Sequence, residues 1–162
     1  MPVEGEVLAG LKDRFGASSF RSLSIVRNRV VKVVMDRKDL VAVCSFLKDK
    51  FDMAHLSSIT AVDWRDHYES VYHLTSWSRN FMVQINAIIP HDDPHIASVT
   101  PLWNGANVHE REAYDLMGII YDGHPNLTRI LLPKDFEFFP LRKDFPQEVD
   151  RQYVSRRKIG GG

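Results

Sequence analysis

Apolar side chains recur at helical spacing in two stretches near the N-terminus. Residues 3–15 predict a short amphipathic helix, which Gly16 is well placed to end. Asp36 is placed to cap a second helix, whose apolar side chains again fall on one face. The apolar positions are Val3, Val7, Leu8, Leu11 and Phe15 in the first stretch and Leu40, Val43, Leu47 and Phe51 in the second. Each predicted helix therefore has one apolar face to bury.

Four further stretches have the pattern of β-strands. Residues 29–35 are apolar and mostly β-branched, which predicts a strand buried on most of both faces. Residues 57–64, 68–77 and 81–89 predict three more strands, the last two joined by a short connection. Along residues 81–89 apolar side chains alternate with more polar ones, so one face of the sheet should be packed. The whole pattern predicts an α+β fold, with helices packed on a mostly antiparallel sheet.

The pattern changes in the C-terminal half. Residues 95–102 predict a short helix, and residues 107–117 predict a firmer one that Gly118 ends. Beyond Asp122, residues 123–148 hold four prolines and clustered aromatic residues with no sustained period. Such a segment is too apolar for a solvated tail and too irregular to form its own core. We therefore predict an α+β domain over residues 1–121 and an extended, irregular, partner-binding strap over residues 122–162.

Composition narrows the expected partners and cofactors. The 162 residues fit one domain, and Lys plus Arg and Asp plus Glu both total 21, so no net charge draws the chain to nucleic acid. An iron–sulfur cluster needs about four thiolates, whereas the only cysteine is Cys44, in the apolar pattern of the second helix. The N-terminus lacks a signal-peptide pattern, and no run reaches the roughly 18 apolar residues of a membrane span. We expect a cofactor-free protein in a reducing, aqueous compartment, with only indirect membrane contact.

The densest polar cluster lies on the predicted helix over 107–117. A metal site there would need two histidines four residues apart, but the position four residues after His109 is alanine. Glu110 and Glu112 lie about 200° apart around a helix, so they cannot chelate one ion together. Local geometry instead predicts an i,i+4 ion pair between Arg111 and Asp115, with Glu110 satisfying the helix N-terminus. No metal ligands are predicted.

A catalytic cluster is the competing chemical interpretation. Glu112, Asp115 and His124 would supply the acid–base groups of a stand-alone enzyme. Against it, no nucleophile with an orienting base lies nearby in the sequence, and no glycine-rich phosphate loop is present. His73 is interpreted as a hydrogen-bonded sheet residue, and the tryptophans at 64, 77 and 103 as core or rim aromatics.

Residues 102–146 resemble the signature region of the C-subunit family of NADH:quinone oxidoreductase, also called the thirty-kilodalton subunit of complex I. The matching elements are Leu102-Trp103, Gly105-Ala106-Asn107, His109-Glu110-Arg111-Glu112, Tyr114-Asp115, Gly118-Ile119, Gly123-His124-Pro125, Leu127, Arg129-Ile130-Leu131 and Pro140-Leu141-Arg142-Lys143-Asp144-Phe145-Pro146. The departures are Val108 where the family usually has Trp, and Phe136, Phe138 and Phe139 in place of its typical Trp, Gly and His.

The resemblance implies that this chain is a structural subunit that carries out no reaction itself. Family members bind no redox cofactor and lie beside the homologue of the D subunit, which receives the quinone, and beside iron–sulfur subunits of the peripheral arm. Flavin and iron–sulfur clusters are then expected in partner subunits. Electrons would pass from NADH, reduced deazaflavin or ferredoxin to a quinone-like acceptor, coupled to cation translocation. The expected place is the cytoplasmic side of the cell membrane, or the equivalent inner face of an organelle membrane. A membrane-bound nickel–iron hydrogenase is an alternative assembly.

The same resemblance gives the expected interface. We expect no catalytic, cofactor-binding or metal-binding residue, and a partner interface made by His109, Glu110, Arg111, Glu112, Asp115, His124, Arg129, Leu141, Arg142, Lys143, Asp144 and Phe145. In an extended strap, Leu141 and Phe145 would point to one side and anchor in apolar pockets of the partner. Arg142 would point to the other side and bind a carboxylate of the partner with its two-pronged guanidinium.

Overall fold

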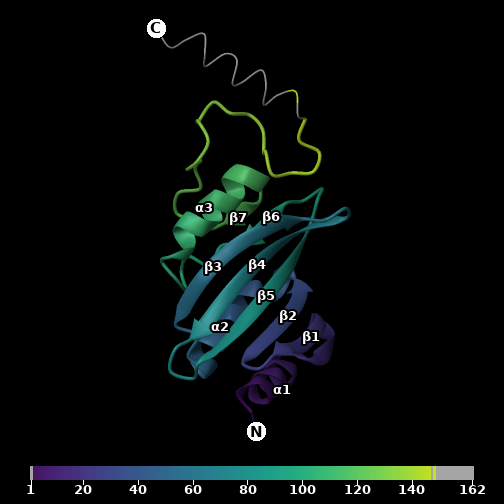
Figure 1. Ribbon diagram of the computed structural model, residues 1–162, viewed down its shortest axis with the longest axis vertical. Helices are drawn as coiled ribbons and strands as arrows, with labels where there is room; N and C mark the ends of the chain where they lie inside the picture. Colours follow the sequence, from purple (N-terminus) through teal and green to yellow (C-terminus); the bar gives the residue numbers. More distant parts are fainter. Residues whose placement is uncertain (1, 147, 149–162) are drawn as a thin grey trace.

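A computed structural model of the chain describes residues 2–146 and 148, and the fold is the predicted α+β arrangement (Figure 1). The helices are α1 (Val3–Phe15), α2 (Leu40–Phe51) and α3 (Ala106–Met117), with single 3-10 turns at Ala17–Ser19 and Arg37–Asp39. The strands are β1 (Phe20–Arg27), β2 (Val30–Asp36), β3 (His55–Asp63), β4 (His67–Ser76), β5 (Phe81–Pro90), β6 (His95–Ala97) and β7 (Ile120–Asp122).

The main sheet has five strands in the order β1-β2-β5-β4-β3. Its neighbouring strands are antiparallel except for β2 and β5, which run parallel. A parallel pair needs a crossover connection, and α2 with the β3–β4 hairpin provides it. The helices α1 and α2 lie on one face of the sheet, and α3 packs against β3 at one end of the sheet, near β6 and β7 (Figure 1). The mostly antiparallel sheet predicted from the sequence is therefore confirmed.

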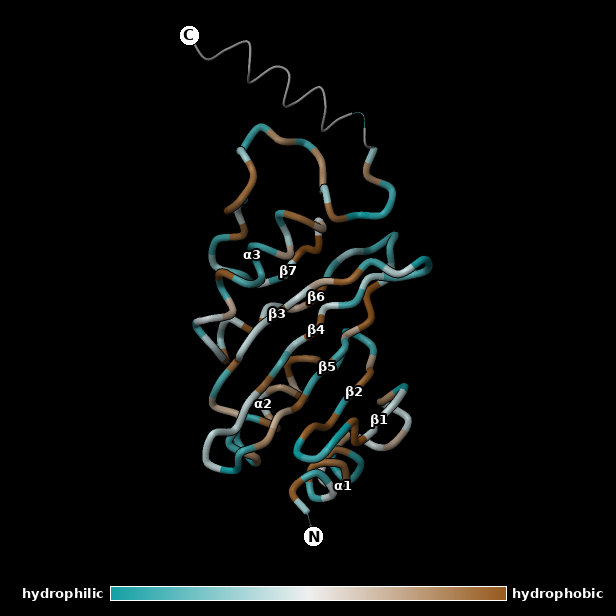
Figure 2. Tube along the Cα trace, in the orientation of Figure 1, coloured by the Kyte–Doolittle hydropathy of each residue, from teal (hydrophilic) through white to brown (hydrophobic). Residues whose placement is uncertain are grey.

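The core lies between this face and the helices. Phe81, Val83 and Ile85 are buried along β5, whereas Met82 and Gln84 between them are only partly buried on the opposite face. Figure 2 shows the resulting alternation of apolar and polar residues along the strands. Alternation along a strand buries every second side chain, so the predicted packing of one face is confirmed.

Several details differ from the predictions. The strand β1 was not predicted, and its mixed burial and two register shifts against β2 explain why it lacks a clear period. The helix predicted over 95–102 is wrong, because His95–Ala97 pairs in parallel with Ile120–Asp122 in a separate two-stranded sheet. Asp36 precedes a 3-10 turn and makes no side-chain cap there, and α2 begins only at Leu40.

The single cysteine and the predicted sheet histidine behave as expected. Cys44 is fully buried in α2, and its burial raises the pKa of the thiol. His73 shares a hydrogen bond with Ser58 across β3 and β4, at 3.0 Å. Within residues 2–146 and 148, every helix is too short or too polar to cross a lipid bilayer.

The three tryptophans divide between core and surface. Trp103 is buried, and its ring N–H donates to the Met53 carbonyl at 3.1 Å. Trp64 is about half exposed, as a rim aromatic would be. Trp77 has 74% of its surface exposed at the end of β4, so the core-or-rim interpretation is wrong for this residue.

Candidate functional site at the junction of α3 and the C-terminal segment

The predicted site residues gather where α3 meets residues 122–146, a segment that we call the tail. Asp115 of α3 is completely buried, and its carboxylate accepts four hydrogen bonds from the tail. The donors are Arg129, at 2.7 Å, and the backbone N–H groups of Ile130, Leu131 and Leu132, at 3.0, 2.7 and 2.9 Å. Burial alone would raise the pKa of Asp115, but the bonds from Leu132, Arg129 and their neighbours outweigh it and lower the pKa.

Arg129 extends this junction to a second part of the tail. Its guanidinium also donates to the Asp115 carbonyl at 2.9 Å and to the Phe138 carbonyl at 3.1 Å. The same group lies over the rings of Phe136 and Phe139, at 5.8 and 5.1 Å from their centres. Asp115 and Arg129 together therefore hold two parts of the tail, residues 129–132 and the backbone at Phe138.

The last turn of α3 holds the tail again at Arg142. Its Nε donates to the Met117 carbonyl at 2.7 Å, and its guanidinium lies 4.5 Å from the ring centre of Phe139 and 5.4 Å from that of Tyr68. The last carbonyls of a helix lack partners within the helix, and a cation at this end is favourable. The backbone N–H of Leu141 donates to a second carbonyl of this last turn, that of Leu116, at 3.1 Å. The tail thus caps α3.

Gly118 makes this close approach possible. It has φ of 71°, a left-handed conformation that non-glycine residues adopt at a cost. A Cβ at this position would lie 2.4 Å from Nη2 of Arg142 and 2.8 Å from the ring of Phe139. The sequence predicted only that Gly118 ends the helix. The structure shows that the absence of a side chain at Gly118 also leaves room for Arg142.

Two local pairings predicted from spacing are wrong. Arg111 does not pair with Asp115, because it binds the carbonyl and hydroxyl of Thr128, both at 3.1 Å, and the carbonyl of Arg129, at 3.3 Å. Glu110 does not satisfy the N-terminus of α3 either, because its carboxylate binds elsewhere. The spacing of charges along one helix could not reveal these partners, because they belong to segments that return to the helix from elsewhere in the chain.

Glu110 is instead a buried carboxylate inside the molecule. Its side chain is completely buried and accepts hydrogen bonds from the Ser98 hydroxyl, at 2.6 Å, and the Val99 N–H, at 2.7 Å. Burial raises the pKa of Glu110 to about 7, against the lowering effect of the bonds from Ser98 and Val99. The residue therefore ties α3 to the turn that follows β6.

The remaining predicted residues occupy varied positions. The ring of His124 is fixed by two backbone contacts, to the Asn107 carbonyl at 3.1 Å and from the Asn126 N–H at 2.9 Å. His109 is partly buried on α3, whereas Glu112 is exposed. Because Asp115 and His124 bind structural partners and no described hydrogen bond joins them to each other or to Glu112, the structure does not assemble these three into an acid–base cluster. Among the described residues, no group of three metal-binding side chains comes together.

The tail is irregular, as predicted, and it turns twice near its end. Backbone bonds from Arg142 to Phe139 and from Phe145 to Arg142, both 3.2 Å, close these turns. The alternation of side chains expected for residues 140–146 is therefore absent, and Arg142 points to α3 of its own chain. Lys143 is fastened through its N–H to the Asp63 carboxylate at 2.8 Å, and Phe145 packs edge-on against Phe138.

Four apolar side chains of the tail stay in contact with solvent, and we call them the exposed apolar residues. They are Ile130, Leu131, Phe138 and Leu141, exposed by 39, 60, 40 and 58%. Asp144 and Lys143 are exposed close to them in the sequence. Of the strap predicted over 122–162, residues 147 and 149–162 lie outside the described part of the chain.

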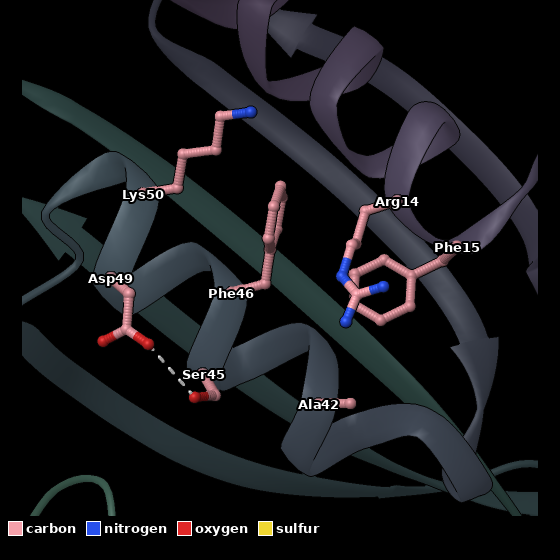
Figure 3. A pocket seen from close by; sticks show the side chains of 7 residues that line it. All are labelled: Arg14, Phe15, Ala42, Ser45, Phe46, Asp49 and Lys50. Carbon is pink, nitrogen blue, oxygen red and sulfur yellow. Dashed lines mark hydrogen bonds between the residues drawn. The ribbon is translucent and has the colours of Figure 1, made fainter.

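A separate hollow of about 360 Å³ lies between α1 and α2. Figure 3 shows the rings of Phe15 and Phe46 in it, which meet edge to face at 5.6 Å. Arg14 lies over the first ring at 5.8 Å and Lys50 over the second at 5.4 Å. Both cations therefore lie against aromatic rings of their own chain. We interpret the hollow as part of the packing of α1 against α2, and not as a ligand site.

Comparison with known proteins gives one family. A model described as "Respiratory-chain NADH dehydrogenase, 30 Kd subunit" matches residues 33–151. The C subunit of NADH-quinone oxidoreductase from Saccharopolyspora erythraea is 38% identical over 138 residues, covering 80% of this chain and 54% of that protein. The C subunit of F(420)H(2) dehydrogenase from Methanosarcina mazei is 37% identical over 130 residues, covering 76% of this chain and 82% of that protein.

Some relatives are much longer than this chain. The C/D subunit of NADH-quinone oxidoreductase from Pectobacterium atrosepticum is 36% identical over 160 residues, covering 90% of this chain and 25% of that protein. The chain thus spans about half the length of the Saccharopolyspora relative and about a quarter of the Pectobacterium one.

Solved structures share the fold. A trypsin-resistant fragment (1–134) of Nqo5 matches with a TM-score of 0.65 and 26% identity, covering 78% of this chain and all of that one. A chain in the structure of the membrane-bound sulfane sulfur reductase, an archaeal respiratory membrane complex, matches with a TM-score of 0.76 over 98% of this chain and 92% of that one. Its identity is 21%, so this second match supports the fold alone.

Proposed function

Because this chain belongs to the family of the 30 kDa subunit of the respiratory-chain NADH dehydrogenase, we propose that it is a cofactor-free structural subunit in the peripheral arm of a membrane-bound complex I-type oxidoreductase. In this role it supports the homologue of the D subunit, which receives the quinone-like acceptor, and contacts neighbouring iron–sulfur subunits. It does not react by itself and lies peripherally on the cytoplasmic side of the membrane.

The observation that carries this proposal is the arrangement of the tail. Buried polar contacts from Asp115, Arg129 and Arg142 fix its backbone, while its apolar side chains at 131 and 141 face solvent. Exposed apolar residues on a fixed frame are typical of protein interfaces, since a prearranged surface loses little entropy on binding. The existence of relatives named as C/D subunits supports a D-type polypeptide as the partner.

The proposed interface divides the predicted residues into two groups. We propose that His109, Glu112, Leu141, Lys143, Asp144 and Phe145 contact the partner. The others, Glu110, Arg111, Asp115, His124, Arg129 and Arg142, hold the contacting residues in place from within the chain. We also propose that flavin, iron–sulfur clusters and the site of the electron donor belong to partner subunits. The relatives' names include both NADH and F(420)H(2) as donors.

Purification of the tagged chain from detergent-solubilised membranes tests the proposal. We expect the D homologue and iron–sulfur subunits to co-purify with it, identified by mass spectrometry. We also expect a strain lacking the chain to lose the intact complex and its quinone reductase activity together. Recovery of the chain alone, or a complex that assembles fully without it, would contradict the proposal.

A further inference from the structure

A chain of hydroxyl groups leads from the buried carboxyl group of Glu110 toward solvent. Oε2 of Glu110 lies 2.6 Å from the Ser98 hydroxyl, which in turn lies 2.8 Å from the Thr100 hydroxyl. Glu110 is completely buried and Ser98 is 5% exposed, whereas Thr100 is only partly buried. These three side chains therefore connect a carboxyl group inside the molecule with the surface.

The charged side chains on the neighbouring elements bind other partners. Arg111, the next residue of α3, binds Thr128. His95 of β6 and Asp122 of β7 bind each other at 2.9 Å. Among the described residues, no lysine, arginine or histidine forms an ion pair with Glu110. A charge on this carboxyl group therefore has no counter-charge, and an unpaired buried charge is unfavourable.

The other titratable side chains that face Glu110 are neutral. Burial is the main cause that raises the pKa of Tyr72 of β4 and of Tyr121 of β7, and the Glu110 carboxylate acts on both in the same direction. Cys44 of α2 interacts with Tyr72, and burial raises the pKa of its thiol as well. These groups carry no charge near neutral pH, so the surroundings of Glu110 favour the protonated acid.

The hydroxyl chain can bond to either form of the acid, because a hydroxyl group both donates and accepts hydrogen bonds. When Glu110 is charged, Ser98 donates to it and Thr100 donates to Ser98. When Glu110 is neutral, its own O–H donates to Ser98, and Ser98 donates to Thr100. The Val99 N–H, 2.7 Å from Oε1, is bonded in both forms. The observed distances therefore suit both protonation states, with the direction of the hydroxyl bonds reversed.

We propose that Glu110 is a proton-binding site that exchanges its proton with solvent through Ser98 and Thr100, and that loss of this proton opens the turn at residues 98–103. On release, the carboxyl proton passes to Ser98 Oγ as the Ser98 hydroxyl proton passes to Thr100 Oγ1. The hydroxyl proton of Thr100 passes to water. Each hydroxyl group thus keeps one proton, and of the three side chains only Glu110 becomes charged.

The turn responds to Glu110 because it joins β6 to α3 beside this carboxyl group. The Ser98 N–H donates to the Asp122 carbonyl at 2.8 Å, and the Trp103 N–H donates to the Val99 carbonyl at 3.1 Å. Figure 1 shows β6, β7 and α3 together at one end of the sheet. Opening of the turn would admit water to the carboxylate, so a charged Glu110 favours the open form.

The direction of the pH dependence follows from proton binding. The pKa of Glu110 is raised from 4.5 to about 7 by burial when the turn is closed, so between these pH values the closed form binds more protons than the open form. The closed turn is therefore most stable below about pH 4.5, and its stability falls as pH rises to about 7.

Titration of the carboxyl group tests the site and its path. In the full chain with carbon-13 in the glutamate side chains, Glu110→Gln identifies the NMR signal of the Glu110 carboxyl group. That signal should titrate with a midpoint at about pH 7, against 4.5 for an ordinary glutamate. Thr100→Val removes the acceptor that the neutral form needs, so the midpoint should fall by about one pH unit. Thr75→Val is the matched control, because it also removes a hydroxyl bonded to a serine, Ser57 at 2.9 Å, and should leave the midpoint unchanged.

Amide hydrogen exchange tests the opening of the turn. Each rate is compared with that of an unstructured peptide at the same pH, which gives the protection of the amide. The protection of Val99 should fall by about tenfold or more from pH 5 to 7, and in Glu110→Gln it should stay nearly constant, because this side chain cannot become charged. At pH 7 Val99 should also be less protected than Ile85 of β5, since the turn opens while the sheet stays folded.

The outcomes separate the parts of the proposal. A midpoint near 4.5 in the unchanged chain would overturn the proton-binding site, and a midpoint that Thr100→Val does not move would overturn the path. Equal protection of Val99 and Ile85 at every pH would show that the turn opens only when the whole chain unfolds, against the proposal. The side-chain amide of Glu110→Gln can donate to Ser98 as the neutral acid does, so this variant should fold. If it does not, the carboxyl signal is assigned through the backbone resonances of Glu110, and the same outcomes decide.

Discussion

Replacing Asp115 by alanine should release the tail from α3 while the main sheet stays folded. The substitution removes the acceptor of four hydrogen bonds, three of them from the consecutive amides of Ile130, Leu131 and Leu132. It also leaves Arg129 without its carboxylate partner. None of these contacts contributes to the five-stranded sheet, so the loss should be local.

The magnitude follows from burial. Truncating one member of a buried ion pair costs about 3–5 kcal/mol. Here Asp115 is completely buried, but the side chains of Ile130 and Leu131 are exposed, so water can reach their amides once the carboxylate is gone. We therefore take the lower end, about 3 kcal/mol, which corresponds to about a hundredfold in an opening equilibrium.

Hydrogen exchange measures this loss residue by residue. In Asp115→Ala the amides of residues 130–132 should exchange about a hundredfold faster than in the unchanged chain, and the amides of β5 should stay slow. Glu112→Ala is the matched control, because it removes an exposed carboxylate from the same helix and should leave residues 130–132 slow. If Asp115→Ala leaves the exchange of residues 130–132 unchanged, the Asp115 carboxylate does not hold the tail on α3.

Three further changes test other parts of the molecule. The pKa of Glu110 is raised from 4.5 to about 7 in the folded chain, so between these pH values the folded chain binds more protons than the unfolded chain. The free energy of unfolding should therefore fall as pH rises from about 4.5 to 7. Urea titrations at several pH values should show this fall, and Glu110→Gln should flatten it. Gly118→Ala should lower the free energy of unfolding by about 2 kcal/mol through its left-handed backbone and the clash with Arg142, while Gly105→Ala, with φ of −61° and nothing within 4 Å, should change it little. Arg142→Lys keeps the charge but loses the planar contact and the bond to Met117, and should cost about 1 kcal/mol in the same assay.

The elements with a strong local period could be predicted from the sequence. The helix predicted over residues 3–15 is α1, and the strand predicted over 81–89 is β5. α1 places side chains from successive turns in the core, and β5 places every second side chain there. The spacing of apolar residues in the sequence therefore indicates directly which side chains are buried. β1 is an edge strand with two register shifts, so its side chains follow no regular pattern of burial. The sequence therefore did not predict this strand.

The pairing of charges could not be predicted, and magnitudes explain why. An ion pair between Arg111 and Asp115 on one helix would contribute about 0.2–0.5 kcal/mol. The same carboxylate gains much more from four donors in a buried site, so the returning tail displaces the local partner. The positions of those donors depend on how residues 122–146 fold back, and a sequence without period gives no information on that path.

The tail shows how an irregular apolar segment can serve two surfaces. Its apolar content predicted that it packs against a partner, and some of its apolar side chains are already buried within the chain. Phe136 is buried and Phe139 contacts Arg129, Arg142 and Tyr114. In contrast, Leu131 and Leu141 keep more than half of their surface exposed. A free strap would have to be ordered on binding, at about 1–2 kcal/mol for each residue fixed. Because the contacts with α3 already fix residues 128–143, a partner that covers Leu131 and Leu141 meets a surface whose ordering cost is largely removed.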